Sequence, residues 1–183
     1  MDVSSEAAPL AQRLVTMQVW SEQGQLAEVI RTAADLSLPD RKTVYTYDAW
    51  GNRPVTETAV ISGQASPVIR RAWRHGLDVQ LSETSPRGLV TSWVWDEFGR
   101  LKQEIRADGP GTTVQYLSCS GSCFAARGVY QVRSSRSDGF WSTTINDAYG
   151  RAVGSEFPLT GGQSSRQLTE YDALGRVHRQ TVP

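Results

Sequence analysis

The segment Tyr171-Asp172-Ala173-Leu174-Gly175-Arg176 is the clearest form of a motif that recurs along this chain of 183 residues. The motif is an aromatic residue, Asp, two variable residues, Gly and Arg. Three further segments follow it closely: Tyr47-Asp48-Ala49-Trp50-Gly51-Asn52, Trp95-Asp96-Glu97-Phe98-Gly99-Arg100 and Asn146-Asp147-Ala148-Tyr149-Gly150-Arg151. Their aspartates are separated by 48, 51 and 25 residues, which indicates a period near 25 residues with two members missing.

Weaker copies lie close to the missing positions. One copy, with Ser in the Asp position, is Trp20-Ser21-Glu22-Gln23-Gly24-Gln25. A second copy, which lacks one residue of the motif, is Trp73-Arg74-His75-Gly76. The last position of the repeat series, between Asp96 and Asp147, is occupied by the segment Cys119–Cys123. A second series of turn signals, centred on residues 39, 63, 88, 109, 139 and 161, alternates with the first at a mean gap of about 24 residues. The segments between turns are about 8 residues long, which is typical of strands, so each repeat is predicted to be a β-hairpin.

The motif has a physical explanation as a turn. Asp at the first position can accept hydrogen bonds from backbone N–H groups further round the turn, while Gly adopts the positive φ that a type I turn followed by a bulge requires. The aromatic residue ends the incoming strand, and the Arg after Gly can lie over a neighbouring ring or carboxylate. The residues predicted to carry this structural motif are Tyr47, Asp48, Gly51, Asn52, Trp95, Asp96, Gly99, Arg100, Asp147, Gly150, Arg151, Tyr171, Asp172, Gly175 and Arg176.

The predicted fold is therefore all-β: a curved antiparallel sheet of consecutive hairpins. About seven repeats cover residues 15–183, after a loose lead-in over residues 1–14. A helix is the alternative for Leu26 to Leu38, where apolar residues follow helical spacing. A strand over Leu26 to Arg31 is favoured, because every other repeat has its return strand at this position.

Composition excludes several classes of protein. With 19 basic and 19 acidic residues the formal net charge is 0, and 39% of the residues are hydrophobic, as in an ordinary folded domain. No apolar stretch approaches the roughly 20 residues that span a bilayer, and the first residues, which include Asp2 and Glu6, do not resemble a signal peptide. The balanced charge argues against nucleic acid as a partner.

The two cysteines, Cys119 and Cys123, flank a Ser-Gly-Ser sequence that could bring their sulfurs together. A local disulfide and two free thiols are equally compatible with this spacing. Because the entropy that a disulfide removes grows with loop length, so small a loop is expected to contribute little stability.

At the motif residues, from about Val15 to Pro183, the sequence resembles the Rhs/YD-repeat family, named for its Tyr-Asp dipeptide followed by x-x-Gly-Arg. Tyr171 to Arg176 matches fully; the other copies carry Asn52 for Arg, Trp95 for Tyr and Asn146 for Tyr. The family includes subunits of bacterial polymorphic and insecticidal toxins and the animal teneurins, in which a long sheet spirals into a hollow shell.

The resemblance implies a structural function, as a segment of a shell that encloses or presents a toxin or adhesive partner. The implied partners are further YD repeats or a toxin segment of the same or a neighbouring protein. The implied location is secreted or on the cell surface, as part of a larger bacterial system. Such shells contain many more than seven repeats, so the chain is expected to be a piece of one. It contains neither the self-cleaving core segment of many relatives nor a toxin domain.

No enzyme, cofactor or metal site is expected. The motif aspartates could be imagined as acid/base pairs, but one per repeat at equivalent turns is typical of structural residues. His75 and His178 lie in polar surroundings and are interpreted as exposed turn and strand residues, because no Gly-x-Ser-x-Gly or His-Glu-x-x-His motif accompanies them.

The tryptophans and the two edge strands lead to two further expectations. The tryptophans Trp20, Trp50, Trp73, Trp93, Trp95 and Trp141 allow an alternative function as a carbohydrate-binding or adhesion module, although packing within the sheet is favoured. The first and last strands, near residues 15–20 and 177–182, are unpaired edges without several Lys residues to protect them, so edge-to-edge self-association is expected.

Overall fold

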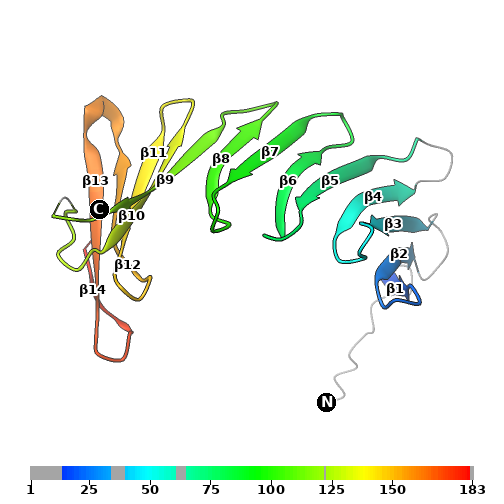
Figure 1. The fold of residues 1–183 in the computed structure, drawn as a ribbon, viewed down its shortest axis with the longest axis horizontal. Coiled ribbons are helices and arrows are strands. Elements are labelled where there is room, and N and C mark those ends of the chain that lie inside the picture. Colours follow the sequence, from blue (N-terminus) through cyan, green and yellow to red (C-terminus); the bar gives the residue numbers. More distant parts are fainter. Residues whose placement is uncertain (1–13, 34–39, 61–64, 122, 182–183) are drawn as a thin grey trace, which may run out of the picture. The chain divides into compact units, whose positions relative to one another are not determined.

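The computed structural model describes residues 14–33, 40–60, 65–121 and 123–181. The chain divides into two compact units, Met1–Thr91 and Ser92–Pro183. The first unit contains β1 (Leu14–Trp20), β2 (Leu26–Ala33), β3 (Arg41–Tyr47), β4 (Pro54–Val60), β5 (Val68–Arg74), β6 (Val79–Thr84) and the first residues of β7 (Val90–Trp95). The second contains the rest of β7, then β8 (Leu101–Arg106), β9 (Thr112–Ser118), β10 (Tyr130–Arg136), β11 (Trp141–Asn146), β12 (Ala152–Pro158), β13 (Ser164–Tyr171) and β14 (Val177–Gln180), with a 3-10 turn η2 (Thr160–Gly162) between β12 and β13 (Figure 1).

Within each unit, the described strand pairs are antiparallel and join strands that follow one another in the chain. No α-helix occurs in the described ranges, so the prediction of an all-β fold of consecutive hairpins is confirmed. Residues 1–13 of the expected lead-in, the turns centred on residues 39 and 63, and residue 182 lie outside the described residues.

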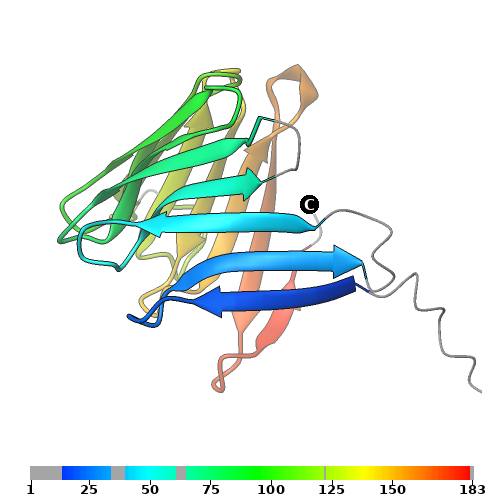
Figure 2. The ribbon, with the colours of Figure 1, turned by 90° about the vertical axis from the view of Figure 1, so that its right-hand side faces the viewer.

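The ambiguous segment after Leu26 is a strand. β2 covers Leu26–Ala33 and pairs with β1 on one side, where Met17 lies opposite Ile30, and with β3 on the other. Figure 2 shows β1, β2, β3 and β4 lying side by side. The helical alternative is therefore wrong over this range, because pairing on both sides of β2 outweighs a local helical spacing.

Few side chains are fully buried, because the hairpins of each unit form one layer of sheet over much of their length. In the described part of the first unit, Val29 is the single buried hydrophobic residue. The second unit has a small core where Cys119, Ala125, Ile145 and Val153 meet, with Tyr171 packed against it. One face of the sheet is therefore covered at this place by the segment 119–129, which connects β9 with β10.

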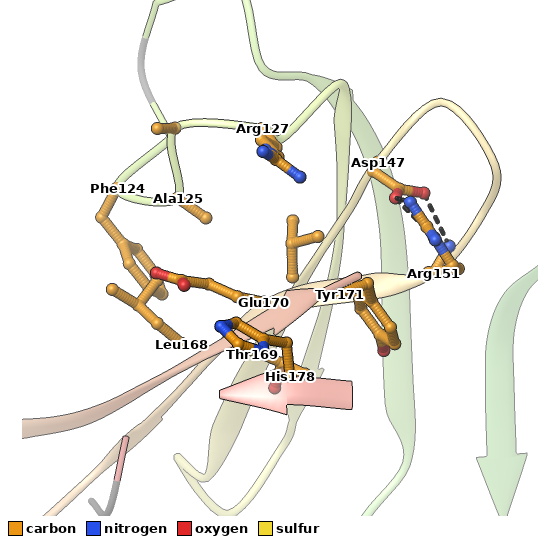
Figure 3. Close-up of a pocket in the computed structure, with 12 residues that line it drawn as sticks. Phe124, Ala125, Arg127, Asp147, Arg151, Leu168, Thr169, Glu170, Tyr171 and His178 are labelled. Atoms are coloured by element: carbon orange, nitrogen blue, oxygen red, sulfur yellow. Dashed lines mark hydrogen bonds and ion pairs between the residues drawn. The ribbon is translucent and has the colours of Figure 1, made fainter. Parts of the chain in front are cut away.

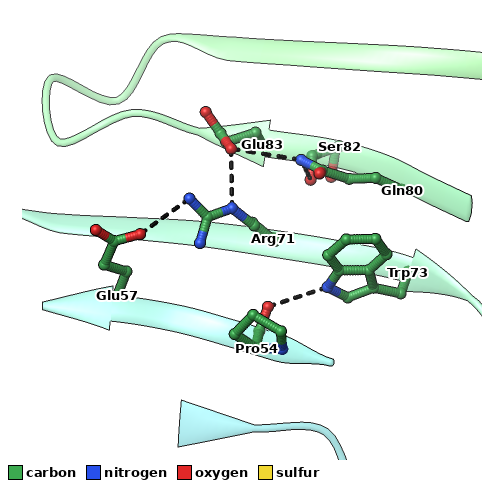
Figure 4. A network of polar contacts seen from close by, with 7 residues as sticks. All are labelled: Pro54, Glu57, Arg71, Trp73, Gln80, Ser82 and Glu83. Carbon is green, nitrogen blue, oxygen red and sulfur yellow. Dashed lines mark hydrogen bonds and ion pairs between the residues drawn. The ribbon is translucent and has the colours of Figure 1, made fainter. Parts of the chain in front are cut away.

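Elsewhere, polar contacts between strands supplement the thin apolar packing. Arg71 on β5 donates to Glu57 on β4 at 3.1 Å and to Glu83 on β6 at 2.9 Å, so one guanidinium joins three strands (Figure 4). The Arg71 side chain is only 17% exposed, and this burial limits the screening by solvent that weakens surface ion pairs. The indole of Trp73, on the same strand, donates to the carbonyl of Pro54 at 3.0 Å.

A β-bulge recurs at the same place in five hairpins. In each one the register shifts by one residue just after the turn, so one residue near the start of the return strand has no partner opposite it. These extra residues are Ala27, Val55, Leu81, Val153 and His178. Four of the five are apolar, and His178 is the exception.

Candidate functional site

Three of the predicted motif turns have the same geometry. In the turn of Asp147, one carboxylate oxygen accepts hydrogen bonds from the backbone N–H of Tyr149 at 2.9 Å and of Arg151 at 3.0 Å, and the other accepts from the Arg151 Nε at 2.8 Å. The turns of Asp96 and Asp172 repeat these contacts to within 0.1 Å. The predicted hydrogen bonds to Asp are thus confirmed.

The glycines of the four motifs have the predicted backbone conformation. Their φ angles are 71° at Gly51, 75° at Gly99, 78° at Gly150 and 79° at Gly175. Each of these glycines also donates its N–H to the carbonyl of the motif Asp three residues earlier. A side chain at these positions would be strained, because left-handed backbone is unfavourable for residues with a Cβ.

The turn of Asp48 differs, because it is one residue longer. The Asp48 carboxylate accepts a hydrogen bond from the backbone N–H of Asn52 at 2.9 Å. The Arg after this turn is Arg53, and its guanidinium pairs with Asp78 of the next hairpin and not with Asp48. As a result, the buried Oδ2 of Asp48 has no hydrogen-bond partner among the described residues, and the Nδ1 of His75 lies 3.9 Å from it. His75 is half exposed and its ring lies 3.9 Å from that of Trp50.

At three of the turns an Arg contacts an aromatic residue of the following hairpin. The guanidinium carbon lies 4.7 Å from the ring centre for Arg151 over Tyr171, and 4.4 Å for Arg100 over Tyr116. Arg53 lies 5.4 Å from the ring of Trp73 in the same way. All three distances are within the range of a cation–π interaction, so these three turns are attached to the hairpins that follow them.

The aromatic residues make the return contact to the preceding hairpin. Tyr171 donates its hydroxyl to the carbonyl of Ala152 at 3.1 Å, and Tyr47 donates to that of Leu26 at 3.1 Å. In both cases the acceptor is the first residue of the preceding return strand. Contacts run in both directions at two junctions, through Arg151 and Tyr171 and, in the same way, through Arg53 and Trp73, whose indole donates to the carbonyl of Pro54.

Of the three weak copies, the turn of Ser21 keeps the hydrogen bonds of the motif, the turn after Trp73 has positive φ at both Gly76 and Asp78, and the Cys119 copy does not form a short turn. Ser21 replaces Asp but still accepts from the N–H of Gln23 and Gln25, and Gly24 has a φ of 77°. The Cys119 slot is different, because residues 119–129 form a longer loop between β9 and β10. The expectation that a simple motif turn lies there is wrong.

This loop is closed by a disulfide and packed onto the sheet. Cys119 and Cys123 are bonded, with 5.2 Å between their Cα atoms, which decides between the two alternatives left open by the sequence. Gly154 on β12 lies directly beneath the loop, because a Cβ placed there would be 3.1 Å from both Ala125 and Phe124. The bulge at Val153 turns that side chain toward the same core.

A pocket of about 400 Å³ lies between this loop and the strands β12, β13 and β14. Figure 3 shows Arg127 on the loop side and Glu170 with His178 on the strand side. Ala125 and Val153 contribute buried apolar surface, and the volume falls in the range of small-ligand sites, about 300 to 1,000 Å³. This is the best-formed candidate site in the described part of the chain.

The polar groups of the pocket are of two kinds. Asp147 and Arg151 are paired with each other, and the Asp147 side chain is only 7% exposed. The side chains of Arg127, Glu170 and His178 are exposed and make no hydrogen bond or ion pair with the described residues, although His178 is near enough to Asp172 to help lower the pKa of that carboxyl. The pocket therefore has a cation and an anion, from different walls, that are free to meet a ligand.

The same contacts set the ionisation of the motif aspartates. Burial alone would raise the pKa of the Asp147 carboxyl, but the guanidinium and the backbone N–H of Arg151 together lower it below its usual value. For Asp172 the backbone N–H of Arg176 is the largest cause of a lowered pKa, and burial opposes it. Both carboxylates are thus held in the charged form.

The sequence did not predict this pocket. It identified Cys119, Cys123 and His178 separately, and placed His178 correctly on the last described strand, but it did not bring them together. Comparison of equivalent repeat positions could have indicated His178. The corresponding bulged residues of the other hairpins are Ala27, Val55, Leu81 and Val153. A polar residue in an otherwise apolar repeat position marks a departure from the structural pattern.

The tryptophans are only partly packed. Trp73, Trp93, Trp95 and Trp141 are half-buried, in line with the interpretation favoured from the sequence. Trp20 and Trp50 are 58% and 65% exposed. The described ranges contain no group of three or more His, Cys, Asp or Glu side chains suited to a metal ion, and no helix among them is long and apolar enough to cross a membrane.

Taken together, the two units are antiparallel arrays of repeated hairpins with a pocket in the second. No known protein family matches the sequence, and neither does any curated protein. Among solved structures, the Tc holotoxin pore of Photorhabdus luminescens contains a chain with a similar fold, with a TM-score of 0.59 and 14% sequence identity. The match covers 90% of this chain but only 9% of that one, so this chain spans a small fraction of its structural neighbour's length.

Proposed function

We propose that this chain is a non-enzymatic structural segment of a YD-repeat shell that encloses or presents a toxin or adhesive partner. The observation that carries the proposal is the repeated joining of hairpins at the motif, with Arg151 over Tyr171 and Tyr171 bonded to Ala152. Such contacts extend a sheet one hairpin at a time, as a long wall requires. The fold similarity to a chain of the Tc holotoxin pore supports the same interpretation.

The test is to co-express the chain with the polypeptides encoded on either side of it, in fusion and as separate chains. The expected result is co-purification together with slower proteolysis of the neighbouring polypeptide. An unrelated β-sheet protein of similar size is the control for non-specific protection. If the neighbouring sequences carry no further repeats or toxin, and neither polypeptide associates with the chain, the proposal fails.

The proposed location is outside the cell or on its surface, as part of a larger bacterial system. The disulfide between Cys119 and Cys123 supports this location, because disulfides persist in oxidising compartments. Protease treatment of intact cells that express the tagged natural protein tests it. Complete protection of the tag in intact cells, and its digestion after lysis, would contradict this location.

Self-association through strand edges is a further part of the proposal. All seven residues of β1 are exposed, including Val15 at 54% and Met17 at 52%, and β1 pairs only with β2 among the described residues. We expect light scattering to show association that rises with concentration and that Met17→Lys weakens, because a charge on an edge strand opposes pairing. Gln23→Lys, in the adjacent turn, is the control; equal association of all three proteins would refute the edge mechanism.

A second candidate is a carbohydrate-binding or adhesion module, favoured by the exposure of Trp20 and Trp50. Exposed indoles can stack on sugar rings, whereas packed ones cannot. A change in tryptophan emission on adding oligosaccharides, lost in Trp50→Ala, would support this candidate over the shell.

A further inference from the structure

The departures from the repeat pattern in the second unit fall at one place. The 119–129 loop replaces a motif turn, the disulfide closes its first residues, and His178 takes a bulge position that is apolar in the four other bulged hairpins. Residues 124–127 of the loop and His178 line the same pocket of about 400 Å³, and the disulfide closes the loop beside them. Breaks in an otherwise consistent sequence pattern are expected at functional positions.

The walls of the pocket are held in place before any ligand binds. Phe124 lies under the guanidinium of Arg166 at 4.9 Å, and that guanidinium is itself paired with Glu156. On the other side, the ring of Tyr171 is fixed by Arg151 and by its hydrogen bond to Ala152. A site with fixed walls loses little conformational entropy when it binds.

The free groups define the chemistry of the ligand. Arg127 offers a guanidinium from the loop, and Glu170 offers a carboxylate from β13, while Phe124 and Leu168 add apolar surface to the lining. The ligand that complements this arrangement has an apolar group flanked by an anion and a cation. A polypeptide provides this combination when an apolar residue stands between an acidic and a basic one.

We propose that the pocket binds a peptide segment in which an apolar side chain is flanked by one acidic and one basic residue. The acidic residue pairs with Arg127, the basic residue pairs with Glu170, and the apolar side chain lies against Phe124 and Leu168. His178 borders the site and donates or accepts a further hydrogen bond. This inference rests on the proposed function, since it makes the pocket a contact point for the enclosed or presented chain.

The experiment uses the full chain, labelled with ¹⁵N, and blocked tripeptides as probes. The probes are acetyl-Glu-Leu-Lys-amide and its reverse order, acetyl-Lys-Leu-Glu-amide; the comparison peptides have Gly for Leu or Gln for both charged residues. We expect shifts of amide signals in residues 124–127 and 168–171. Loss of the Leu side chain should weaken binding about tenfold or more, from the apolar area it buries.

Variants of the free charges test the assigned contacts. Arg127→Gln and Glu170→Gln should each weaken binding about threefold, as for partly exposed ion pairs, with the loss absent for the Gln-containing probe. Arg87→Gln and Glu97→Gln change exposed residues of the same types outside the pocket and should leave binding unchanged. His178→Val restores a residue type found at equivalent bulges, so it tests the pocket in a variant that is expected to fold.

Several results would overturn the proposal. Absence of signal changes at millimolar peptide, or equal binding of charged and uncharged probes, would remove the peptide assignment. Shifts of the same residues by maltose or cellobiose, without any by the peptides, would replace it with a glycan site. None of these outcomes bears on whether the chain associates with its encoded neighbours, so failure of this inference and failure of the shell function are separate.

Discussion

Breaking the Cys119–Cys123 disulfide should destabilise the second unit measurably, although the loop is small. The bonded residues are four apart in sequence, so about five residues are closed, and the loop-entropy relation gives about 2 kcal/mol at 25 °C. For a chain of this length that corresponds to a decrease in melting temperature of about 4 to 8 °C. The sequence-based expectation of a small contribution is thus compatible with a measurable one.

The assay is urea unfolding of the oxidised and reduced chain, with Cys119→Ser/Cys123→Ser as the control that reductant should not affect. Hydrogen exchange locates the change: the N–H of Cys119 donates to the carbonyl of Val129, and the N–H of Val129 donates to that of Asn146. We expect faster exchange at these two amides and little change in β2 to β5. Unfolding curves that coincide with and without reductant, or a loss spread evenly over both units, would refute the reasoning.

Three more predictions concern the motif. A double-mutant cycle of Arg100→Gln and Tyr116→Leu should give a coupling of about 0.5 to 1 kcal/mol, the scale of an exposed cation–π pair; zero coupling would show that the stacking contributes nothing. Gly150→Val should cost about 1 to 3 kcal/mol in urea unfolding, because φ there is 78° and the nearest atom to an added Cβ is 3.8 Å away, leaving backbone strain as the cause; Ala148→Val in the same turn is the control and should cost much less. Because the folded pKa of Asp172 is lowered, the stabilisation from this carboxylate is complete above about pH 4 and is lost as the pH falls through the folded pKa. The urea midpoints of Asp172→Asn and the natural chain should therefore differ by a constant amount from pH 7 to about pH 5 and approach each other as the pH falls below about 4; a difference that stays unchanged below pH 4 would contradict the assignment.

The features that could be predicted from sequence are those that depend on residues close together in the chain. The turn of Asp147 is one example, because Asp, Gly and Arg lie within five residues and determine the geometry among themselves. The strand at Leu26–Ala33 was also predictable, but only from its place in the repeat, since its own apolar spacing favours a helix. A fixed period thus supplied information that the local pattern did not.

The pocket could not be predicted, because it depends on contacts between residues far apart in sequence. Ala125 reaches it through the packing of a loop over Gly154, and His178 through a one-residue shift in the pairing of β13 with β14. The turn of Asp48 shows the same limit on a smaller scale. One additional residue there moved the guanidinium to Arg53, which pairs with Asp78 instead of Asp48.

The joining of neighbouring hairpins by an Arg and an aromatic residue, as at Arg151 and Tyr171, has a consequence for the evolution of the gene. Duplication or deletion of one complete repeat brings the same Arg and aromatic positions together at the new junction, so the array can lengthen or shorten without any compensating substitution. Insertion of a single residue within a strand is different, because it exchanges the two faces of that strand from the insertion onward. Variation among relatives should therefore be concentrated in whole repeats and in turns, where the 119–129 loop shows that a long insertion can be accommodated.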